Sequence, residues 1–131
     1  MTSGSYTVRV EARFESAHFL RSYRGVAEPL HGHSYKVEAE VSLAGGALDH
    51  EAIAVDFVST KKILEEIAKR LDYKCINEVA PFTEQSPSAE NIAAWFHQEL
   101  TKKVMEQRAF VDAITIWEGP LNSVTYRPEP A

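Results

Sequence analysis

Two stretches of alternating residues constrain the fold of this chain more than any other feature. From Tyr6 to His18, apolar or small residues occupy every second position, and charged residues occupy most positions between them. The same period of two runs from His31 to Leu43. Because this period is typical of a strand that buries one face, both stretches are predicted to be strands. Each places histidine on its inner face, at the end that adjoins the connecting loop 19–30.

Helical spacing and capping residues define the middle of the chain. Apolar residues three and four apart predict a helix from about Val58 to Leu71, with Asp56 or Ser59 near its start. Further on, Ser88 precedes a second apolar stripe and is the expected N-cap of a second helix. The sequence between these helices carries no sustained period and is expected to be irregular.

The last part of the chain predicts a hairpin. Residues 110–117 and 123–127 are rich in β-branched and aromatic side chains and are separated by Gly, Pro, Leu and Asn. The element order is therefore strand, strand, helix, helix, strand, strand. A chain of 131 residues suits one domain covering 1–131, and the polar residues 1–5 are expected to be disordered.

Charge and composition exclude several classes of protein. A net charge of −5 and a pI near 5.5 argue against a nucleic-acid-binding protein or an anionic-membrane surface, because such surfaces cluster Lys and Arg. The single Cys75 excludes an intramolecular disulfide. No apolar run is long enough to cross a membrane. The chain is therefore expected to be cytoplasmic.

Three histidines on two predicted strands indicate a metal site. His31 and His33 are two residues apart and project to one side, and His18 projects from the same face of the neighbouring strand. Opposed residues on paired strands lie about 5 Å apart, so three imidazoles can converge on one ion. The alternative is three hydrogen-bonded core histidines. Three neutral imidazoles with an open fourth position are typical of catalytic zinc, so we predict Zn²⁺ as cofactor. His50 and His97 have no second histidine near them in the sequence, so they are expected to be surface or packing residues.

Several short motifs are shared with a known family. They are Phe14-Glu-Ser-Ala-His18, Leu30-His31-Gly32-His33, Val55-Asp56-Phe57, Leu71-Asp72 followed by Asn77, Pro87-Ser88-Ala89-Glu90-Asn91, and Glu118 at a strand end. On these motifs the chain resembles the 6-pyruvoyl-tetrahydropterin synthase family, which includes 6-carboxytetrahydropterin synthase. The resemblance implies an α+β tunnelling fold, with two helices inserted between strands 2 and 3 of a four-stranded antiparallel sheet. It also implies a homohexamer, a dimer of trimers, with active sites between subunits.

The resemblance assigns roles to individual residues. The zinc ligands of the family fall on the three histidines named above, and its pterin-anchoring carboxylate falls on Glu118. A carboxylate there can accept two parallel hydrogen bonds from the pterin ring N–H and its exocyclic amine. The alternative is a solvated glutamate at a strand end. Ser88 and Glu90 occupy the turn where family members contact the pterin, although a plain helix cap explains them equally well.

Two departures from the family pattern bear on the reaction. Ordinary members carry a catalytic cysteine where this chain has Ala27, and a histidine after the Leu-Asp pair where it has Tyr73. Glu28 stands beside the vacant position, which resembles the type III subgroup. In that subgroup a carboxylate replaces the thiol and dihydroneopterin triphosphate is cleaved to 6-hydroxymethyl-dihydropterin, a folate precursor. The two losses belong together, because a thiol needs an imidazole to stay deprotonated whereas a glutamate is ionised at neutral pH without help.

We therefore expect a zinc-dependent carbon–carbon lyase acting on a pterin triphosphate. Zinc would lower the pKa of the side-chain hydroxyls and Glu28 would act as general base. Asp72 is a weaker candidate for supporting proton transfer. Tyr73 either serves packing alone or has a catalytic role, in which its phenol hydrogen-bonds the carboxylate or relays a proton. Three alternatives stay open: 6-carboxy- or 6-pyruvoyl-tetrahydropterin synthase activity, an inactive pterin- and zinc-binding module, and a structural zinc protein. Cations available for the triphosphate are Arg21, Arg24, Lys36 and Arg127.

Overall fold

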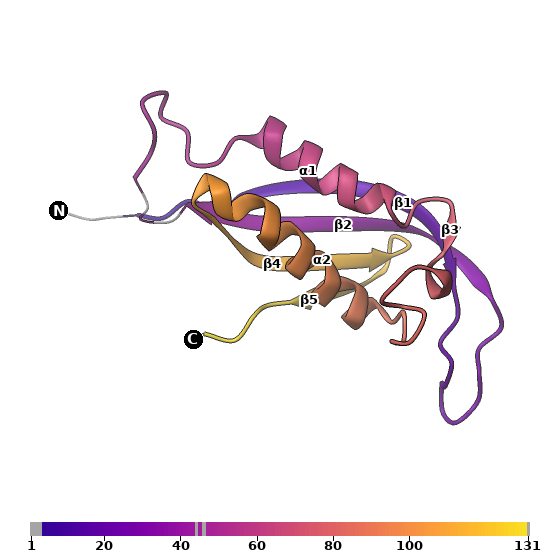
Figure 1. The fold of residues 1–131 in the computed structure, drawn as a ribbon. Coiled ribbons are helices and arrows are strands. Elements are labelled where there is room, and N and C mark those ends of the chain that lie inside the picture. The colour runs from indigo at the N-terminus through magenta and orange to yellow at the C-terminus, as the bar shows by residue number, and fades with distance from the viewer. Residues whose placement is uncertain (1–3, 44, 46, 131) are drawn as a thin grey trace.

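A twisted sheet with two helices on one face forms the framework of the computed structural model, which describes residues 4–43, 45 and 47–130 (Figure 1). Five strands lie in the order β3-β1-β2-β4-β5. The elements are β1 (Val8–His18), β2 (His31–Leu43), α1 (Phe57–Lys69), β3 (Lys74–Cys75), α2 (Ala89–Val104), β4 (Ala109–Glu118) and β5 (Asn122–Tyr126), with short 3₁₀ turns at Ile76–Glu78 and Met105–Gln107. This is the α+β arrangement that the sequence predicts.

The two alternating stretches pair as antiparallel strands. The register runs from Val8 opposite Val41 to His18 opposite His31. Along β1, buried and exposed residues alternate from Val10 to Ser16, as the period of two predicts. Because the pairing ends at the two histidines, the loop between them begins at the histidine-bearing end of the sheet.

Both helices cover the inner face of the sheet, and their caps match the prediction. Asp56 accepts a hydrogen bond from the backbone N of Val58 at 2.9 Å, and Ser88 accepts one from Asn91 N at 3.2 Å. The core combines the inner sheet residues with the helix stripes, including Leu64 and Phe96, both 0% exposed. No helix in the described part of the chain is long and apolar enough to span a membrane.

The sheet has one strand more than the sequence predicts. The short strand β3 runs parallel to β1 and pairs with Ser16 and Ala17. Two residues carry no readable period, so the sequence could not reveal this strand. The predicted helix over 58–71 ends at Lys69, and the predicted disorder of residues 1–5 falls mostly on 1–3, outside the described residues.

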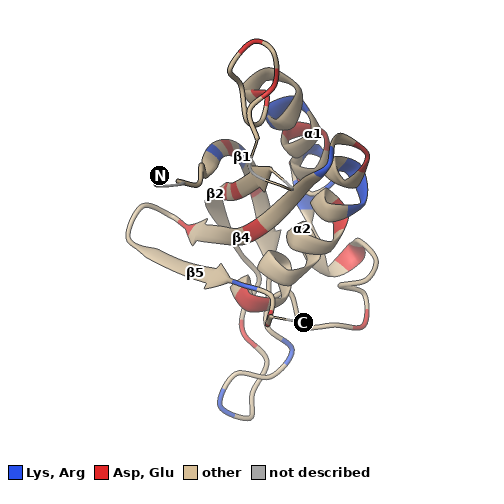
Figure 2. Cartoon of the chain, turned by 90° about the vertical axis from the view of Figure 1, so that its left-hand side faces the viewer, with Lys and Arg blue, Asp and Glu red and all other residues tan. Residues whose placement is uncertain are grey.

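The outer face of the sheet carries charged side chains and a cavity. Figure 2 shows acidic and basic residues along the strands as well as on the helices. A cavity of about 680 Å³ opens on this face, near the β4–β5 turn. Its lining residues are Arg13, Phe14, Glu15, Ser34, Tyr35, Lys36, Asp72, Tyr73, Trp117, Gly119 and Pro120.

An ion-pair cluster between the helices gives a test of acid stability. Glu99 binds Lys102 at 2.8 Å and Arg70 at 2.5 Å, and these hydrogen bonds hold the pKa of Glu99 below its usual value. A carboxylate whose pKa is lower in the folded state stabilises the fold at pH values above its unfolded-state pKa. This stabilisation is lost as the pH falls through the folded-state pKa. Glu99→Gln should therefore cost roughly 0.5–1 kcal/mol at pH 7, with both partner cations largely exposed. Urea melts should show the difference shrinking towards pH 3; a constant difference would contradict the ion-pair explanation.

Candidate metal centre

The register of β1 and β2 brings the three predicted histidines together. His18 lies directly opposite His31, and His33 follows on the same face of β2. One ligand nitrogen from each lies within 4.8 Å of the others, and the Nε2 atoms of His18 and His31 are 3.1 Å apart. Two nitrogens bound to one tetrahedral zinc at about 2.1 Å lie roughly 3.4 Å apart. The cluster therefore has the size of a zinc site.

Backbone carbonyls select the tautomer of two of these histidines. Nδ1 of His18 lies 2.8 Å from the Pro87 carbonyl oxygen, and Nδ1 of His31 lies 2.8 Å from that of Pro29. A carbonyl only accepts hydrogen bonds, so each Nδ1 carries the proton and donates it. In the neutral ring the lone pair is then on Nε2, which faces the cluster. This is the outer-shell arrangement that orients histidine ligands in metal sites.

His33 completes the cluster with an unsatisfied atom. Its Nε2 is buried and has no hydrogen-bond partner among the described residues. Burial lowers the pKa of His33, although the charge of Glu118 acts in the opposite direction. The neutral ring with an unused lone pair is what a metal requires. The donor set, the tautomers and this orphaned atom all fit Zn²⁺.

Glu118 and Tyr35 flank the histidines. Glu118 is the last residue of β4 and lies opposite Tyr35 of β2. Its two carboxylate oxygens are each 3.9 Å from a histidine Nε2, one on His18 and one on His33. The Tyr35 hydroxyl is buried and has no partner among the described residues, and leaving such a group unpaired costs about 1–3 kcal/mol. Burial, then the charges of Glu118 and Glu28, raises the pKa of Tyr35, so its hydroxyl lies within electrostatic reach of both carboxylates.

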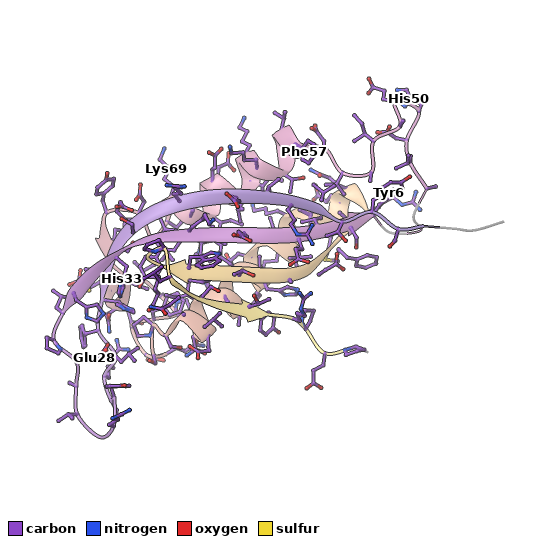
Figure 3. The ribbon with its side chains drawn as sticks, turned by 180° about the vertical axis from the view of Figure 1, so that it is seen from behind. Tyr6, Glu28, His33, His50, Phe57 and Lys69 are labelled. Carbon is purple, nitrogen blue, oxygen red and sulfur yellow. The ribbon has the colours of Figure 1, made fainter. Side chains whose placement is uncertain are left out.

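Glu28 is held at the base of the loop that joins the histidine-bearing strands. Its backbone N donates to the Leu20 carbonyl at 3.0 Å, and its Oε1 accepts from Leu20 N at 2.9 Å. Figure 3 shows Glu28 and His33 at the same end of the molecule and His50 at the other. The charge of Glu28 also acts on the pKa of His33. The structure therefore brings Glu28 near the cluster and leaves His50 away from it.

Asp72 and Tyr73 lie beside β1, in the turn between α1 and β3, and Tyr73 lines a second cavity together with His33. Asp72 Oδ1 accepts from the backbone N of Glu15 at 2.8 Å, and Tyr73 N donates to the Glu15 carbonyl at 2.6 Å. Both line the outer-face cavity, and Tyr73 is 84% exposed with a φ of 55°. No hydrogen bond between described residues links either side chain to the cluster. Their catalytic roles stay predictions.

The predicted pterin-contacting turn adjoins the site through its backbone. The Ser88 hydroxyl oxygen caps α2, and Glu90 lies in the first turn of that helix. The preceding carbonyl, that of Pro87, holds His18. The turn therefore positions His18 of the cluster as well as starting a helix, and its contact with pterin stays a prediction.

Most of the cations considered for the triphosphate already have partners. Lys36 binds Glu38 at 3.2 Å over the ring of Trp117, and Arg127 lies 3.7 Å from Glu40. Arg24 stacks on a neighbouring ring, that of Tyr23, near the tip of the loop. The guanidinium of Arg21 donates to the carbonyl oxygens of Phe82, Thr83 and Gln85.

Sequence reasoning missed the functional setting of Tyr35 and Asn77. The side-chain amide of Asn77 bonds both backbone groups of Phe19, at 3.0 and 2.9 Å, and so holds the chain just after His18. The period of two in the sequence places Tyr35 on the inner face, two residues after His33. This was the one sequence signal that could have indicated a role for Tyr35 at the site. That its hydroxyl has no partner could be learned only from the structure.

Comparisons with known proteins agree with this geometry. The family model described as 6-pyruvoyl tetrahydropterin synthase matches residues 7–129. The chain is similar to dihydroneopterin monophosphate aldolase of Pyrococcus furiosus, with 28% identity over 82% of this chain and 85% of that protein. It is also similar to a putative 6-carboxy-5,6,7,8-tetrahydropterin synthase of Archaeoglobus fulgidus, with 28% identity over 77% of this chain and 81% of that protein.

Solved structures show the same fold. The 6-pyruvoyl tetrahydropterin synthase of Caenorhabditis elegans superposes with a TM-score of 0.78 at 21% identity, covering 98% of this chain and 99% of the other. A Plasmodium vivax 6-pyruvoyltetrahydropterin synthase, solved with a catalytic glutamate replaced by alanine, has a TM-score of 0.77 at 18% identity and covers 98% and 100%. The architecture predicted for the chain is therefore confirmed.

Proposed function

The chain belongs to the 6-pyruvoyl tetrahydropterin synthase family, and we propose that it is a zinc-dependent lyase that cleaves 7,8-dihydroneopterin triphosphate to 6-hydroxymethyl-7,8-dihydropterin, in folate biosynthesis. One observation carries the proposal: three histidine nitrogens converge within 4.8 Å, and a glutamate is anchored beside them. The position next to this glutamate, where ordinary members carry the catalytic thiol, is Ala27. A carboxylate base is what this chain offers in its place.

The residues divide the reaction between them. Bound zinc would be held by His18, His31 and His33 and would acidify the side-chain hydroxyls of the substrate. Glu118 accepts hydrogen bonds from the pterin ring, which fixes the ring against the cluster. Glu28 takes the proton from the hydroxyl on the second side-chain carbon. The bond between the first and second side-chain carbons then breaks, and the second and third carbons leave with the phosphate as an aldehyde. The electron pair moves into the ring imine, and protonation of the retained carbon leaves the hydroxymethyl group.

The names of similar proteins support this class of reaction. The Pyrococcus furiosus relative is an aldolase for a dihydroneopterin phosphate, and the Plasmodium vivax protein uses a catalytic glutamate. Asp72 and Tyr73 line the outer-face cavity, and in the expected homohexamer residues at such a surface can complete the site of a neighbouring subunit. The assembly stays a prediction from the resemblance, and the cytoplasmic location stays a prediction from the sequence.

A second candidate substrate is the monophosphate. Three of the four cations considered for a triphosphate have partners here, because Lys36 and Arg127 bind carboxylates and Arg21 binds carbonyls. A shorter phosphate chain needs fewer cations, and the Pyrococcus furiosus relative is named for the monophosphate. The bond that breaks and the pterin product are the same for either substrate.

Product identification tests the proposed function. The purified, zinc-loaded protein is incubated separately with 7,8-dihydroneopterin triphosphate and with the monophosphate, and the pterins are identified by chromatography and mass spectrometry. We expect 6-hydroxymethyl-7,8-dihydropterin from at least one of them. A 6-carboxy or 6-pyruvoyl product would instead assign the synthase activity. Pterin binding without any product would favour the inactive binding module.

A further inference from the structure

Tyr35 presents a buried hydrogen-bond donor that has no acceptor. The residue is 1% exposed, and its hydroxyl oxygen has no partner among the described residues. Its ring is stacked on Phe14 with centroids 4.8 Å apart and an interplanar angle of 2°. It also meets the rings of His18 and His33 edge-on, at 5.9 and 5.4 Å. The ring is therefore held on one face and along its edge by these contacts.

Glu118 presents the complementary case, an acceptor without a donor. The hydrogen bonds between described residues include none to its carboxylate, whose oxygens lie 3.9 Å from the Nε2 atoms of His18 and His33, beyond hydrogen-bond distance. These nitrogens carry the lone pairs that a metal would use, so they cannot serve as donors to Glu118 in the loaded site. The carboxylate therefore needs another donor to fix its orientation.

We propose that the Tyr35 hydroxyl is this donor and orients the Glu118 carboxylate for the pterin. The two residues are directly opposite in the β2–β4 register, on the inner face of the sheet. Opposed side chains leave the sheet about 5 Å apart, so a rotation of Glu118 away from the histidines can bring the groups together. A carboxylate has about four lone-pair sites, so it can accept from Tyr35 and still accept two hydrogen bonds from a ligand. Tyr35 is then a positioning residue; this inference rests on the proposed function.

The other buried hydroxyls without partners do not offer this pairing. Thr60 and Thr101 lie within α1 and α2, where each is flanked by the backbone of its own helix. Thr60→Val is therefore a matched control. It also removes a buried hydroxyl that has no partner among the described residues, but one that lies in α1 and outside the histidine cluster.

A double-mutant cycle tests the proposal. Tyr35→Phe, Glu118→Gln and the double variant are compared with the parent in calorimetric titrations of the zinc-loaded protein with 6-hydroxymethyl-7,8-dihydropterin. Loss of one hydrogen bond to a charged group should weaken binding about tenfold in Tyr35→Phe. In the Glu118→Gln background the same change should have almost no further effect, because Tyr35 acts through Glu118. Zinc content should stay the same, because Tyr35 is not one of the three histidines that would hold the ion.

The outcomes separate this inference from the function on which it rests. Unchanged affinity in Tyr35→Phe with a loss in Glu118→Gln would overturn the inference and leave the proposed function intact. An equal loss from Tyr35→Phe in both backgrounds would also overturn it. Unchanged affinity in Glu118→Gln would show that Glu118 does not anchor the pterin, which would contradict the proposed binding mode as well as this inference. Thr60→Val should match the parent in affinity, and a comparable loss there would show that the assay reports general core effects.

Discussion

Replacing His31 with alanine is expected to abolish stoichiometric zinc binding and to lower turnover by about 10³-fold. The metal is proposed to supply several kcal/mol of stabilisation to the reacting hydroxyl oxygens, and each 1.36 kcal/mol corresponds to a factor of ten in rate. His31 is half-buried at the start of β2, and its Nδ1 bonds only the nearby Pro29 carbonyl. Its loss should therefore leave the fold intact. Metal analysis by mass spectrometry and turnover assays measure the two effects.

His50→Ala is the matched control for this experiment. The His50 side chain is 89% exposed and lies at the other end of the molecule (Figure 3), so zinc content and turnover should equal those of the parent. Zinc retained at one ion per chain in His31→Ala would contradict the three-histidine site. Unfolding of His31→Ala, seen as loss of the circular dichroism signal, would instead support a structural zinc protein.

The second large effect is expected from Glu28→Gln, which should lower turnover by about 10²- to 10⁴-fold, the usual contribution of a general base. Glutamine can still accept the hydrogen bond that Leu20 N now donates to Glu28 Oε1. The loop should therefore keep its conformation, and only the ability to take a proton is lost. Steady-state kinetics should show the change mainly in kcat rather than in KM.

Glu51→Gln provides the comparison, because this exposed glutamate lies in the segment before α1 and has no role in the proposed reaction. Its turnover should be that of the parent. If Glu28→Gln also turned over at the parental rate, Glu28 would not be the general base. The replacement of a catalytic thiol by a carboxylate would then no longer explain why the family cysteine is Ala27 in this chain.

The fold and the histidine cluster were predictable because they depend on local patterns. A period of two assigns the face of every residue in β1 and β2, and a hairpin-like pairing across residues 19–30 then brings the two histidine-bearing ends together. The N-caps Asp56 and Ser88 were predictable because Asp or Ser just before a helical apolar stripe commonly accepts a hydrogen bond from the first turn of the helix. Glu28 could be singled out only by comparison with the family motif.

Contacts between distant segments were not predictable. Arg21 binds carbonyls that lie 61, 62 and 64 residues away, which removes a cation expected at the phosphate. The short strand β3 forms because its two residues pair with the edge of β1 that β2 does not occupy. Neither feature leaves a period, cap or charge pattern in the sequence, because each depends on where a remote backbone happens to lie.

The sequence by itself determined the inner face of each strand, and with it the convergence of His18, His31 and His33. Only the tertiary structure decided what those side chains can do. The carbonyls of Pro29 and Pro87 select which nitrogen keeps its lone pair, and the β2–β4 register places Glu118 opposite Tyr35. The physical reason is that periodicity assigns a side chain to a face, whereas hydrogen bonding requires two particular atoms to lie within about 3 Å.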